Sequence, residues 1–465
     1  MTLREKYFGD KWFYKRLFTV MLPIIVQNAI TNFVSMLDNL MVGRLGTLEM
    51  SGVSIANTLI FVYNLAIFGA ISGAGIFTAQ YYGKEDHEGV RYTFRFKLMI
   101  SLTLSLIAIV ILLSAGDQLV SLYLKGEGDP ADAAVILSFA REYIAVMVFG
   151  LVPSAISQSF SSTLRETDNG VPPMTAGLIA VGVNLVFNYI LIFGNFGAPR
   201  LGVVGAAIAT VISRFVELGI VAGWTFRHQK MAPFIQGAFR SLKVPGQLSL
   251  EIVKKGFPLM FNETLFAMGI AFLDQCYTTR GLNVVAACNI SNTFFNVMSV
   301  AFIAAGSAIG IIMGQQLGAG KIEEAKQDAP RMIVFSILLG IAVGILYIGV
   351  AFIAPRLYNT GEDVRKIATE LLLVTAAFMP FDAALNGSYF MVRSGGKTLI
   401  TMFTDSGLLW LVQCSLAFLL SRFTDMPVVP LFAIVEAGMI VKLTVGLFFV
   451  KQGKWAHTIV EEETI

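Results

Sequence analysis

Residues 17–42 read LFTVMLPIIVQNAITNFVSMLDNLMV, an apolar run in which the one charged side chain is Asp38. About 20 apolar residues, at a rise of 1.5 Å each, cross the ~30 Å hydrocarbon core of a bilayer. The run therefore predicts a transmembrane helix. Pro23 lies inside it and removes a backbone hydrogen bond, so it predicts either a bending point below Asp38 or a static kink.

The same composition extends over the whole chain of 465 residues. Charged residues make up 14%, against about 25% in soluble domains, and hydrophobic residues make up 55%. Such a composition predicts a polytopic membrane protein of the all-α class, with twelve transmembrane helices. The spans lie near 17–42, 50–80, 92–115, 138–163, 172–195, 201–225, 249–275, 284–317, 331–354, 366–392, 398–421 and 428–450.

The basic residues predict how these spans are oriented. With both termini in the cytoplasm, 23 of the 34 Lys and Arg residues lie on the inner side, 8 lie on the outer side and 3 lie in or beside spans. Basic residues gather on the cytoplasmic side of membrane proteins, so this distribution supports that orientation. The net charge of +3 has no clustered basic face and predicts no nucleic-acid partner.

The two halves of the chain repeat each other. Asp38 and Arg44 each have a counterpart 236 residues later, and Pro23 has one at Pro258. TAQYYG at 78–83 pairs with MGQQLG at 313–318, and TLR at 163–165 pairs with MVR at 391–393. Because each repeat has six helices, both begin on the same side, as in transporters built from two parallel bundles. We expect bundles at 1–225 and 249–465, joined by a cytoplasmic linker at 226–248.

Polar residues at membrane depth mark candidate sites in the first bundle, because charges there are costly. Asp38 lies near the outer end of the first span, Asn184 and Asn188 lie one turn apart on the fifth, and Thr210 lies on the sixth. These oxygen donors suit a Na⁺ site formed by Asp38, Asn184 and Thr210, or they could orient a carboxyl group that carries a proton. The alternative is that Asp38 only caps a helix end near water.

The second bundle has its own acidic candidates. Glu263 lies in the middle of the seventh span, and Asp382 lies two residues after Pro380 in the tenth. Asp274 lies at the outer end of the seventh span, where solvation would explain it equally well, and Glu436 in the twelfth span is open between structure and function. We expect these four carboxyl groups to serve a cation or the substrate.

These residues resemble the multidrug and toxic compound extrusion (MATE) family. The resemblance rests on Pro23 and Asp38 with MVGRLG at 41–46, on NLVFNYILIFG at 184–194, on GAAIAT at 205–210, and on Arg165 and RSGGK at 393–397. It implies two six-helix bundles around a V-shaped cavity. It also implies export of organic cations in exchange for Na⁺ or H⁺ by alternating access, with no cofactor, by a monomer in the lipid bilayer of a bacterial inner membrane.

The resemblance also implies roles for single residues. Asp38 matches the coupling aspartate of the N-terminal lobe, Asn184 and Thr210 match its partners, and Pro23 matches the bending proline. Tyr143 resembles a tyrosine near that aspartate, and Glu263 and Asp382 resemble carboxylates found in one branch. Asn188 stands where the family has a second aspartate. This difference makes a Na⁺ site in the N-terminal bundle less favoured, and it makes Glu263 and Asp382 more favoured as the residues that bind the coupling cation.

Two other functions stay open at this level. A flippase for lipid-linked precursors, or another small-metabolite exporter of the same superfamily, would hold phosphates with basic residues. Only Arg214 and Lys442 lie well within spans, against seven acids, which favours cationic substrates. A membrane enzyme is disfavoured because the sequence has no HExxH motif and no nucleophile–histidine arrangement.

Overall fold

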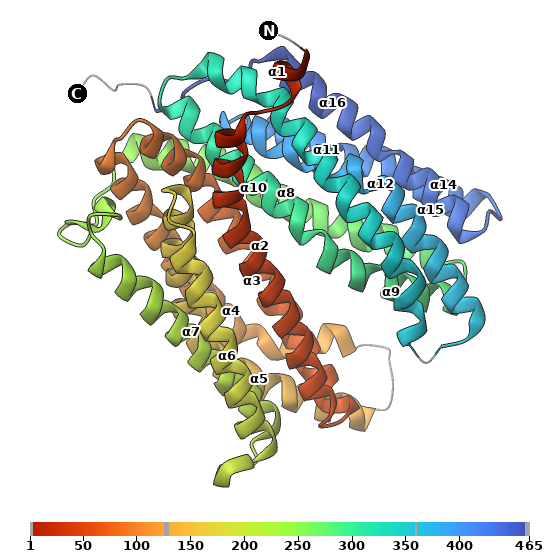
Figure 1. Cartoon of the computed structure of the whole chain (residues 1–465). Helices are drawn as coiled ribbons and strands as arrows, with labels where there is room; N and C mark the ends of the chain where they lie inside the picture. Colours follow the sequence, from red (N-terminus) through yellow and green to blue (C-terminus); the bar gives the residue numbers. More distant parts are fainter. Residues whose placement is uncertain (1–2, 125–129, 359, 461–465) are drawn as a thin grey trace. The chain divides into compact units, whose positions relative to one another are not determined.

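The structure of the chain is a computed structural model that describes residues 3–124, 130–358 and 360–460. It leaves the side chains at 34–36, 39, 40 and 130 undescribed. Every regular element in the described ranges is helical, so the predicted all-α fold is confirmed (Figure 1).

The first half of the chain forms seven α-helices and two short 3₁₀ turns. They are α1 (Leu3–Tyr7), α2 (Lys11–Gly43), α3 (Thr47–Gly83), α4 (His87–Leu124), α5 (Pro130–Glu166), α6 (Val171–Phe193), η1 (Asn195–Gly197), α7 (Gly202–Arg227) and η2 (Pro233–Ile235). Pro23 lies inside α2 as predicted. The left-handed φ of +75° at Gly194 ends α6, and its N–H donates to the Ile190 carbonyl.

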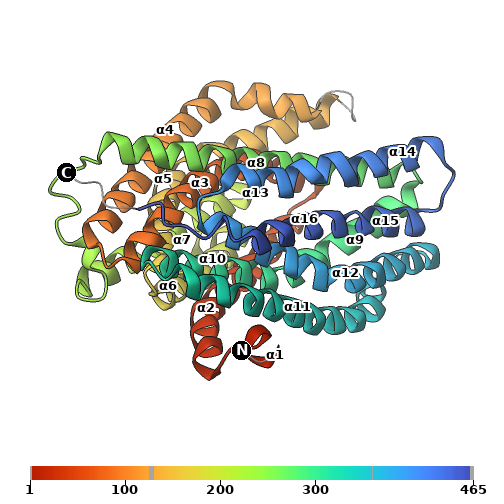
Figure 2. The same cartoon turned by 90° about the horizontal axis from the view of Figure 1, so that it is seen from above.

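The second half repeats this series with more interruptions. Its elements are α8 (Gly246–Thr278), α9 (Leu282–Met298), α10 (Val300–Gly318), α11 (Ile322–Ile353), η3 (Ala354–Leu357), α12 (Glu362–Ser394), α13 (Thr398–Met402), the π-helical η4 (Phe403–Gly407) and η5 (Leu409–Cys414), α14 (Ser415–Phe423), α15 (Val428–Ala437) and α16 (Met439–Gln452). α11 and α12 lie side by side (Figures 1 and 2).

Eleven helical stretches in the described residues are long and apolar enough to cross a membrane. They include all the predicted spans except the first, with ends that differ from the prediction by up to nine residues, as at the start of α11, Ile322 against 331. The predicted first span, 17–42, lies within the 33 residues of α2, which includes side chains outside the described part. The span predicted at 284–317 is made of α9 and α10, and the span at 428–450 is made of α15 and α16.

The eleventh predicted span departs from a regular α-helix. Residues 403–407 and 409–414 form π-helical turns, which widen the backbone by one residue per turn. Such π segments are rare in proteins, and those that occur often lie at functional sites. Here they carry Asp405 and Ser406, which contact α8 and α16, as described below.

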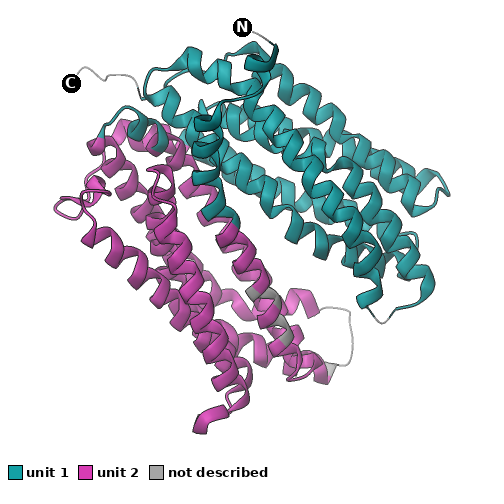
Figure 3. Cartoon of the chain, viewed as in Figure 1, with its two compact units in different colours: residues 1–25, 79–86, 254–465 teal, residues 26–78, 87–253 magenta. Residues whose placement is uncertain are grey.

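The chain divides into two compact units (Figure 3). One unit comprises 1–25, 79–86 and 254–465, and the other comprises 26–78 and 87–253. The boundary in α2 falls between Ile25 and Val26, two residues beyond Pro23. The division predicted from the sequence, 1–225 and 249–465, stays a prediction. We call the two units the C-terminal and the N-terminal unit after the half that makes up most of each.

Each unit has its own apolar core of closely packed helices. In the N-terminal unit, Ile60, Ile67, Ile144 and Ala207 belong to one buried cluster from α3, α5 and α7. In the C-terminal unit, Ala308 and other buried residues of α10 pack with the first part of α2 and with α11. Small side chains at these crossings let the helix backbones come close, as is typical of membrane bundles.

The predicted linker, 226–248, is held against the N-terminal unit. Arg95 of α4 donates to the carbonyl oxygens of Gly237 and Ala238, each at 2.8 Å, and to that of Lys243 at 3.2 Å. Phe234 of the linker is buried, and its ring lies 5.1 Å from that of Phe94. The buried guanidinium thus satisfies backbone groups that would otherwise lack partners.

Residues 79–83 of the first repeated motif meet the second motif, 313–318, inside the C-terminal unit. A side chain at Gly83 would overlap the backbone of Gln315, and one at Gly318 would overlap the backbone of Gln80. Only a residue without a Cβ lets the two backbones approach so closely. The sequence repeat therefore marks a reciprocal helix crossing.

Candidate functional site

Asp38 is the centre of a polar network in the N-terminal unit. It lies on α2, and Asn188 on α6 donates from Nδ2 to Asp38 Oδ1 at 2.5 Å. Asn188 is 1% exposed and Asp38 is half-buried, so the amide end of this bond is shielded from bulk water. A hydrogen bond to an ionised carboxylate in such surroundings is stronger than one between neutral groups.

Asn184 and Thr210 complete the network predicted from the sequence. With its amide nitrogen towards the carboxylate, Asn184 donates to Asp38 Oδ1 at 2.8 Å and accepts a bond from the Thr210 hydroxyl at 3.3 Å. This orientation gives both ends of the amide a suitable partner. Three helices, α2, α6 and α7, therefore converge on one carboxyl group.

Tyr143 on α5 lies beside this network, and it reveals a residue that the sequence reasoning missed. Its hydroxyl donates to the side-chain oxygen of Asn57 on α3 at 3.3 Å. Tyr143 is also close enough to Asp38 and Thr210 to interact with them. Asn57 is a polar residue inside the second predicted span, and a polar side chain at that depth in a membrane could have identified it as a candidate.

One hydrogen-bond acceptor in the network is unsatisfied. Oδ1 of Asn188 is buried and has no hydrogen-bond partner among the described residues. A buried acceptor without a partner costs about 1–3 kcal/mol, so such groups commonly face a ligand. Together with the Asp38 carboxylate and the Thr210 hydroxyl, it forms a set of oxygens suited to a small cation or to a proton. The roles assigned to these residues stay predictions.

Arg214 and Glu217, three residues apart on α7, form an ion pair. Arg214 Nη1 lies 3.3 Å from Glu217 Oε2. Arg214 also acts electrostatically on Asp38, so the network has a basic residue nearby. That residue is largely engaged by Glu217, which leaves Asp38 without a direct ion pair among the described residues.

Glu263 and Asp382 lie in the C-terminal unit, and the structure gives neither carboxylate a hydrogen bond or an ion pair within the described part. Glu263 on α8 is close enough to Arg393 and Asp405 to interact electrostatically, and Asp382 on α12 is similarly close to Lys442 and Asp405. Both acids therefore lie within electrostatic range of Asp405.

Asp405, on the π-helical η4, was not among the site residues predicted from the sequence, but it has the most direct polar contacts in this unit's group of acids. Its Oδ1 lies 3.2 Å from Lys442 Nζ on α16, and its Oδ2 accepts a 3.0 Å bond from Asn262 on α8. Asn262 also accepts from the Ser406 hydroxyl at 2.6 Å. The Lys442 side chain is 4% exposed and lies over the ring of Phe266, 5.6 Å from its centroid.

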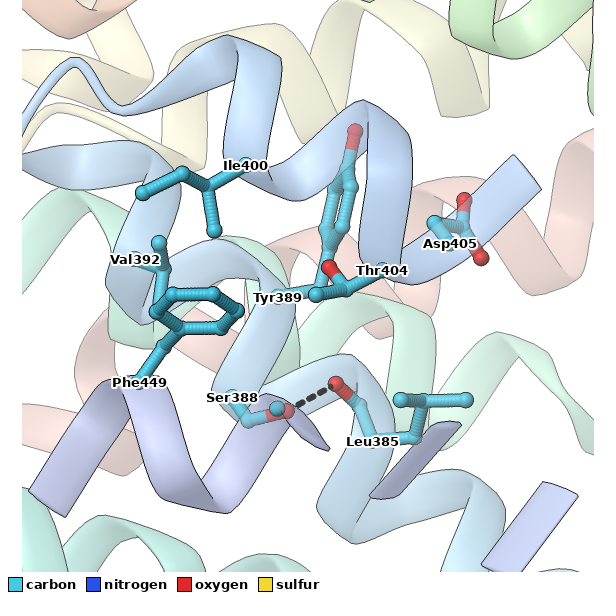
Figure 4. Close-up of a pocket in the computed structure, with 9 residues that line it drawn as sticks. Leu385, Ser388, Tyr389, Val392, Ile400, Thr404, Asp405 and Phe449 are labelled. Atoms are coloured by element: carbon cyan, nitrogen blue, oxygen red, sulfur yellow. Dashed lines mark hydrogen bonds between the residues drawn. The ribbon is translucent and has the colours of Figure 1, made fainter. Parts of the chain in front are cut away.

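A narrow pocket adjoins this ion pair (Figure 4). Its lining includes Tyr389, Thr404 and Asp405, and Ser388 on its wall donates to the Leu385 carbonyl at 2.8 Å. The pocket joins α12, α16 and the π-helical segment. The sequence does not reveal that residues 403–414 leave the α-helical register, so it did not predict this pocket.

Asp274 and Glu436, the other two predicted acids, lie in the same unit. Asn292 of α9 donates to both carboxylate oxygens of Asp274, each at 3.2 Å. Glu436 on α15 interacts electrostatically with Asp382 and Lys442. Among the described residues, no hydrogen bond or ion pair joins Glu436 to Asp274.

A buried pair in the N-terminal unit was also missed. The ammonium of Lys97 on α4 is fully buried and pairs with Glu166 at the end of α5. It also donates to Ser162 at 3.1 Å and to Thr163 at 3.2 Å. Lys97 was counted among the basic residues on the cytoplasmic side, because sequence alone does not show that α4 is buried where it begins.

The model of the MatE family matches residues 23–190 and 258–419, which is more than half of the chain. A probable multidrug resistance protein NorM of Thermotoga maritima is 26% identical over 453 residues, covering 95% of this chain and 93% of the relative. A probable multidrug resistance protein YoeA of Bacillus subtilis is 24% identical over 439 residues, covering 93% and 92%.

Solved structures share the fold over nearly the full length. A crystal structure of MATE in complex with MaL6 has a TM-score of 0.84 at 20% identity, covering 97% of this chain and 98% of the other. A multidrug resistance MATE family transporter of the MOP superfamily, solved in an outward-facing conformation, has a TM-score of 0.84 at 19% identity, covering 95% and 96%. The two matched segments fall one in each repeat, so this chain belongs to the MatE family and is a membrane transporter, not an enzyme.

Proposed function

We propose that this protein is a secondary active multidrug efflux antiporter that exports organic cations in exchange for H⁺ or Na⁺ by alternating access. The observation that carries the proposal is the Asp38 network, in which a carboxyl group at membrane depth is held by Asn184 and Asn188 beside a buried acceptor without a partner. A carboxyl group held in this way can bind or release a cation while most of the hydrogen bonds around it stay in place.

The acidic residues of the C-terminal unit support a cationic substrate. Glu263, Asp382 and Glu436 lie near one ion pair, Lys442–Asp405, so carboxyl groups outnumber bases there. An excess of carboxylates in a low-dielectric region attracts cations and repels anions. The names of the relatives, probable multidrug resistance proteins, agree with this substrate class.

The proposal includes the setting of the protein. It acts as a monomer in the lipid bilayer of a bacterial inner membrane, with both termini in the cytoplasm and without a cofactor. The bacterial relatives support the assignment to a bacterial inner membrane. The 23 to 8 distribution of basic residues supports the cytoplasmic position of the termini. Pro23 provides the bending point, since α2 passes from one compact unit to the other just beyond it.

A different substrate class defines the alternative. A structural relative from Pyrococcus furiosus is described as having a binding pocket of reverse polarity that suggests a different function. A flippase for lipid-linked precursors, or another small-metabolite exporter, would need bases facing the substrate. In the described part of the C-terminal unit two bases are buried, Lys442 and Arg393. Lys442 is paired with Asp405, and Arg393 lies over the rings of Tyr389 and Phe390. Two bases against the four acids Glu263, Asp382, Asp405 and Glu436 disfavour that alternative.

The test is transport by the purified protein in proteoliposomes. A pH gradient and a Na⁺ gradient are imposed separately, and ethidium, an anionic dye and a fluorescent lipid phosphate are offered in turn. We expect ethidium export driven by at least one gradient. Transport of the anionic dye or the lipid phosphate alone, or ethidium movement that ignores both gradients, would refute the proposal.

A further inference from the structure

The last transmembrane segment of each repeat carries one basic residue well inside it. Lys442 follows Arg214 by 228 residues, the offset that also relates Arg393 to Arg165. Arg214 lies on α7 of the N-terminal unit, and Lys442 lies on α16 of the C-terminal unit. The two bases therefore occupy corresponding positions of the repeat, and a difference between their partners is a difference in how each unit neutralises a base.

Arg214 is paired within its own helix. Glu217, three residues further along α7, lies 3.3 Å from it, and the arginine side chain is 41% exposed. The residue that corresponds to Glu217 in the second repeat is Val445, so α16 offers Lys442 no acid at the same spacing. Lys442 pairs instead with Asp405 of η4, with Nζ 3.2 Å from Oδ1. The C-terminal unit thus holds an ammonium beside a carboxylate from another segment.

The ammonium of Lys442 has the surroundings of a bound cation. Its side chain is 4% exposed, and the nitrogen lies over the ring of Phe266, 5.6 Å from the centroid. A carboxylate and the face of an aromatic ring are groups that attract a cation that has lost its water. Lys442 therefore makes, as a tethered group, the contacts that a free cation would make with Phe266 and Asp405.

The same pairing engages both oxygens of the Asp405 carboxylate. Oδ1 faces Lys442, and Oδ2 accepts a 3.0 Å bond from the amide nitrogen of Asn262, a residue that is 1% exposed. The amide is held in this orientation, since its oxygen accepts from the Ser406 hydroxyl at 2.6 Å and from the Ser406 N–H at 3.3 Å. Asp405 also lines the narrow pocket (Figure 4). A metal cation that reached Asp405 would meet the positive charge of the ammonium at close range.

We propose that Lys442 is a fixed cation that takes the place of Na⁺ beside Asp405, and that it thereby restricts Na⁺ binding to the Asp38 network. The inference rests on the proposed antiport and adds a residue that determines where the inorganic cation binds. Asp382 and Glu436 lie within electrostatic range of the same ammonium, so its charge also serves the neighbouring acids. A single site at Asp38 would exchange one Na⁺ at most in each cycle.

The experiment counts the Na⁺ that the purified full-length protein binds, as ²²Na⁺ at equilibrium with choline keeping the ionic strength constant. All variants carry Asp38→Asn, so that the first site is silent. Lys442→Met removes the ammonium and keeps an unbranched side chain, and Lys442→Arg keeps the charge. Lys451→Met is the matched control, because Lys451 is an exposed base on the same helix.

We expect no bound Na⁺ in Asp38→Asn alone, or with Lys442→Arg or Lys451→Met added. Adding Lys442→Met should give one Na⁺ per protein, with an affinity at least tenfold above that of Asp38→Asn alone. Adding Asp405→Asn to that variant should remove the Na⁺ again, because the carboxylate that replaced its ammonium partner with Na⁺ is then gone.

Thermal unfolding gives a second measurement, in sodium chloride and in choline chloride of equal ionic strength. A ligand that binds the folded state raises the melting temperature. Sodium should therefore raise the melting temperature of Lys442→Met by several degrees and leave that of Lys442→Arg unchanged. Even if Lys442→Met fails to fold, Na⁺ bound by Asp38→Asn and lost on adding Asp405→Asn would refute the inference.

The outcomes separate this inference from the proposed function. If Lys442→Met binds no more Na⁺ than Asp38→Asn alone, Lys442 does not exclude Na⁺, and the inference is refuted. Ethidium export by the unmodified protein is measured in parallel under each gradient. Gradient-driven export together with that result leaves the antiport standing, whereas ethidium movement that ignores both gradients refutes the antiport and, with it, the role of Lys442 in coupling.

Discussion

The Asn188 amide donates to the Asp38 carboxylate at 2.5 Å, while the carbonyl oxygen of the same amide is buried without a partner among the described residues. One side chain thus holds the acid in place and presents an oxygen beside it. An amide in this position orients a carboxyl group but adds no charge of its own. The Asp38 carboxyl group is therefore where a change of charge would matter most in this network.

Replacing Asp38 by asparagine should abolish coupling and preserve the fold. The amide has almost the same volume as the carboxyl group and can still accept the bond from Asn188, but it holds neither a proton nor a full charge. We expect gradient-driven ethidium export to fall at least tenfold, with an unchanged or higher melting temperature, because a buried charge is removed.

Asp132→Asn is the control for this prediction, because Asp132 is exposed in the first turn of α5. It should transport as the unmodified protein does. Normal coupled export by Asp38→Asn would remove Asp38 from the mechanism.

The Lys442–Asp405 pair should behave as one unit in stability measurements. Lys442→Met leaves the Asp405 carboxylate without its counter-ion, and breaking a buried pair from one side costs about 3–5 kcal/mol. The double variant Lys442→Met/Asp405→Asn removes both charges and should regain most of that loss. Thermal unfolding in detergent of the two single variants and the double variant measures the coupling. Additive losses would show that the two residues do not interact.

The reciprocal glycine crossing should tolerate no side chain. A methyl group at Gly83 would overlap the Gln315 carbonyl, so Gly83→Ala should destabilise the protein by about 1–3 kcal/mol or more. Gly116→Ala on α4 is the control, since its Cβ would meet no atom within 4 Å, and alanine favours a helix by about 1 kcal/mol. If the two variants have equal melting temperatures, the close approach does not exist in solution.

Gln80 should anchor the segment at 458–460. Its Oε1 accepts from the Ile459 N–H at 2.8 Å and from the Thr458 hydroxyl at 3.3 Å, and its Nε2 donates to the Ser394 carbonyl at 2.9 Å. Gln80→Leu removes these bonds, each worth about 0.5–1.5 kcal/mol. We expect the Ile459 amide to exchange hydrogen at least tenfold faster by mass spectrometry. Gln452→Leu, at an exposed position, should leave that rate unchanged.

Most of the fold followed from the sequence because a bilayer imposes simple rules. Apolar length sets each span, and the structure places Pro23 inside the helix that the first predicted span belongs to. The polar residues of α6 and α7 could be grouped with Asp38 because depth along a helix is proportional to residue number. Asn57 and Asp405 were missed because they contact partners 86 and 37 residues away, and no local pattern encodes such contacts.

The sequence by itself determined the helical class, the spans and the six-helix repeat, because these depend on apolar length and internal similarity. Only the tertiary structure decided which buried charges have partners. It joined Lys442 to Asp405, buried Lys97 beside Glu166, and left the Tyr277 hydroxyl unsatisfied near Glu436. The physical reason is that hydrogen bonds and ion pairs act over a few ångströms between helices, and their geometry exists only after the helices have packed.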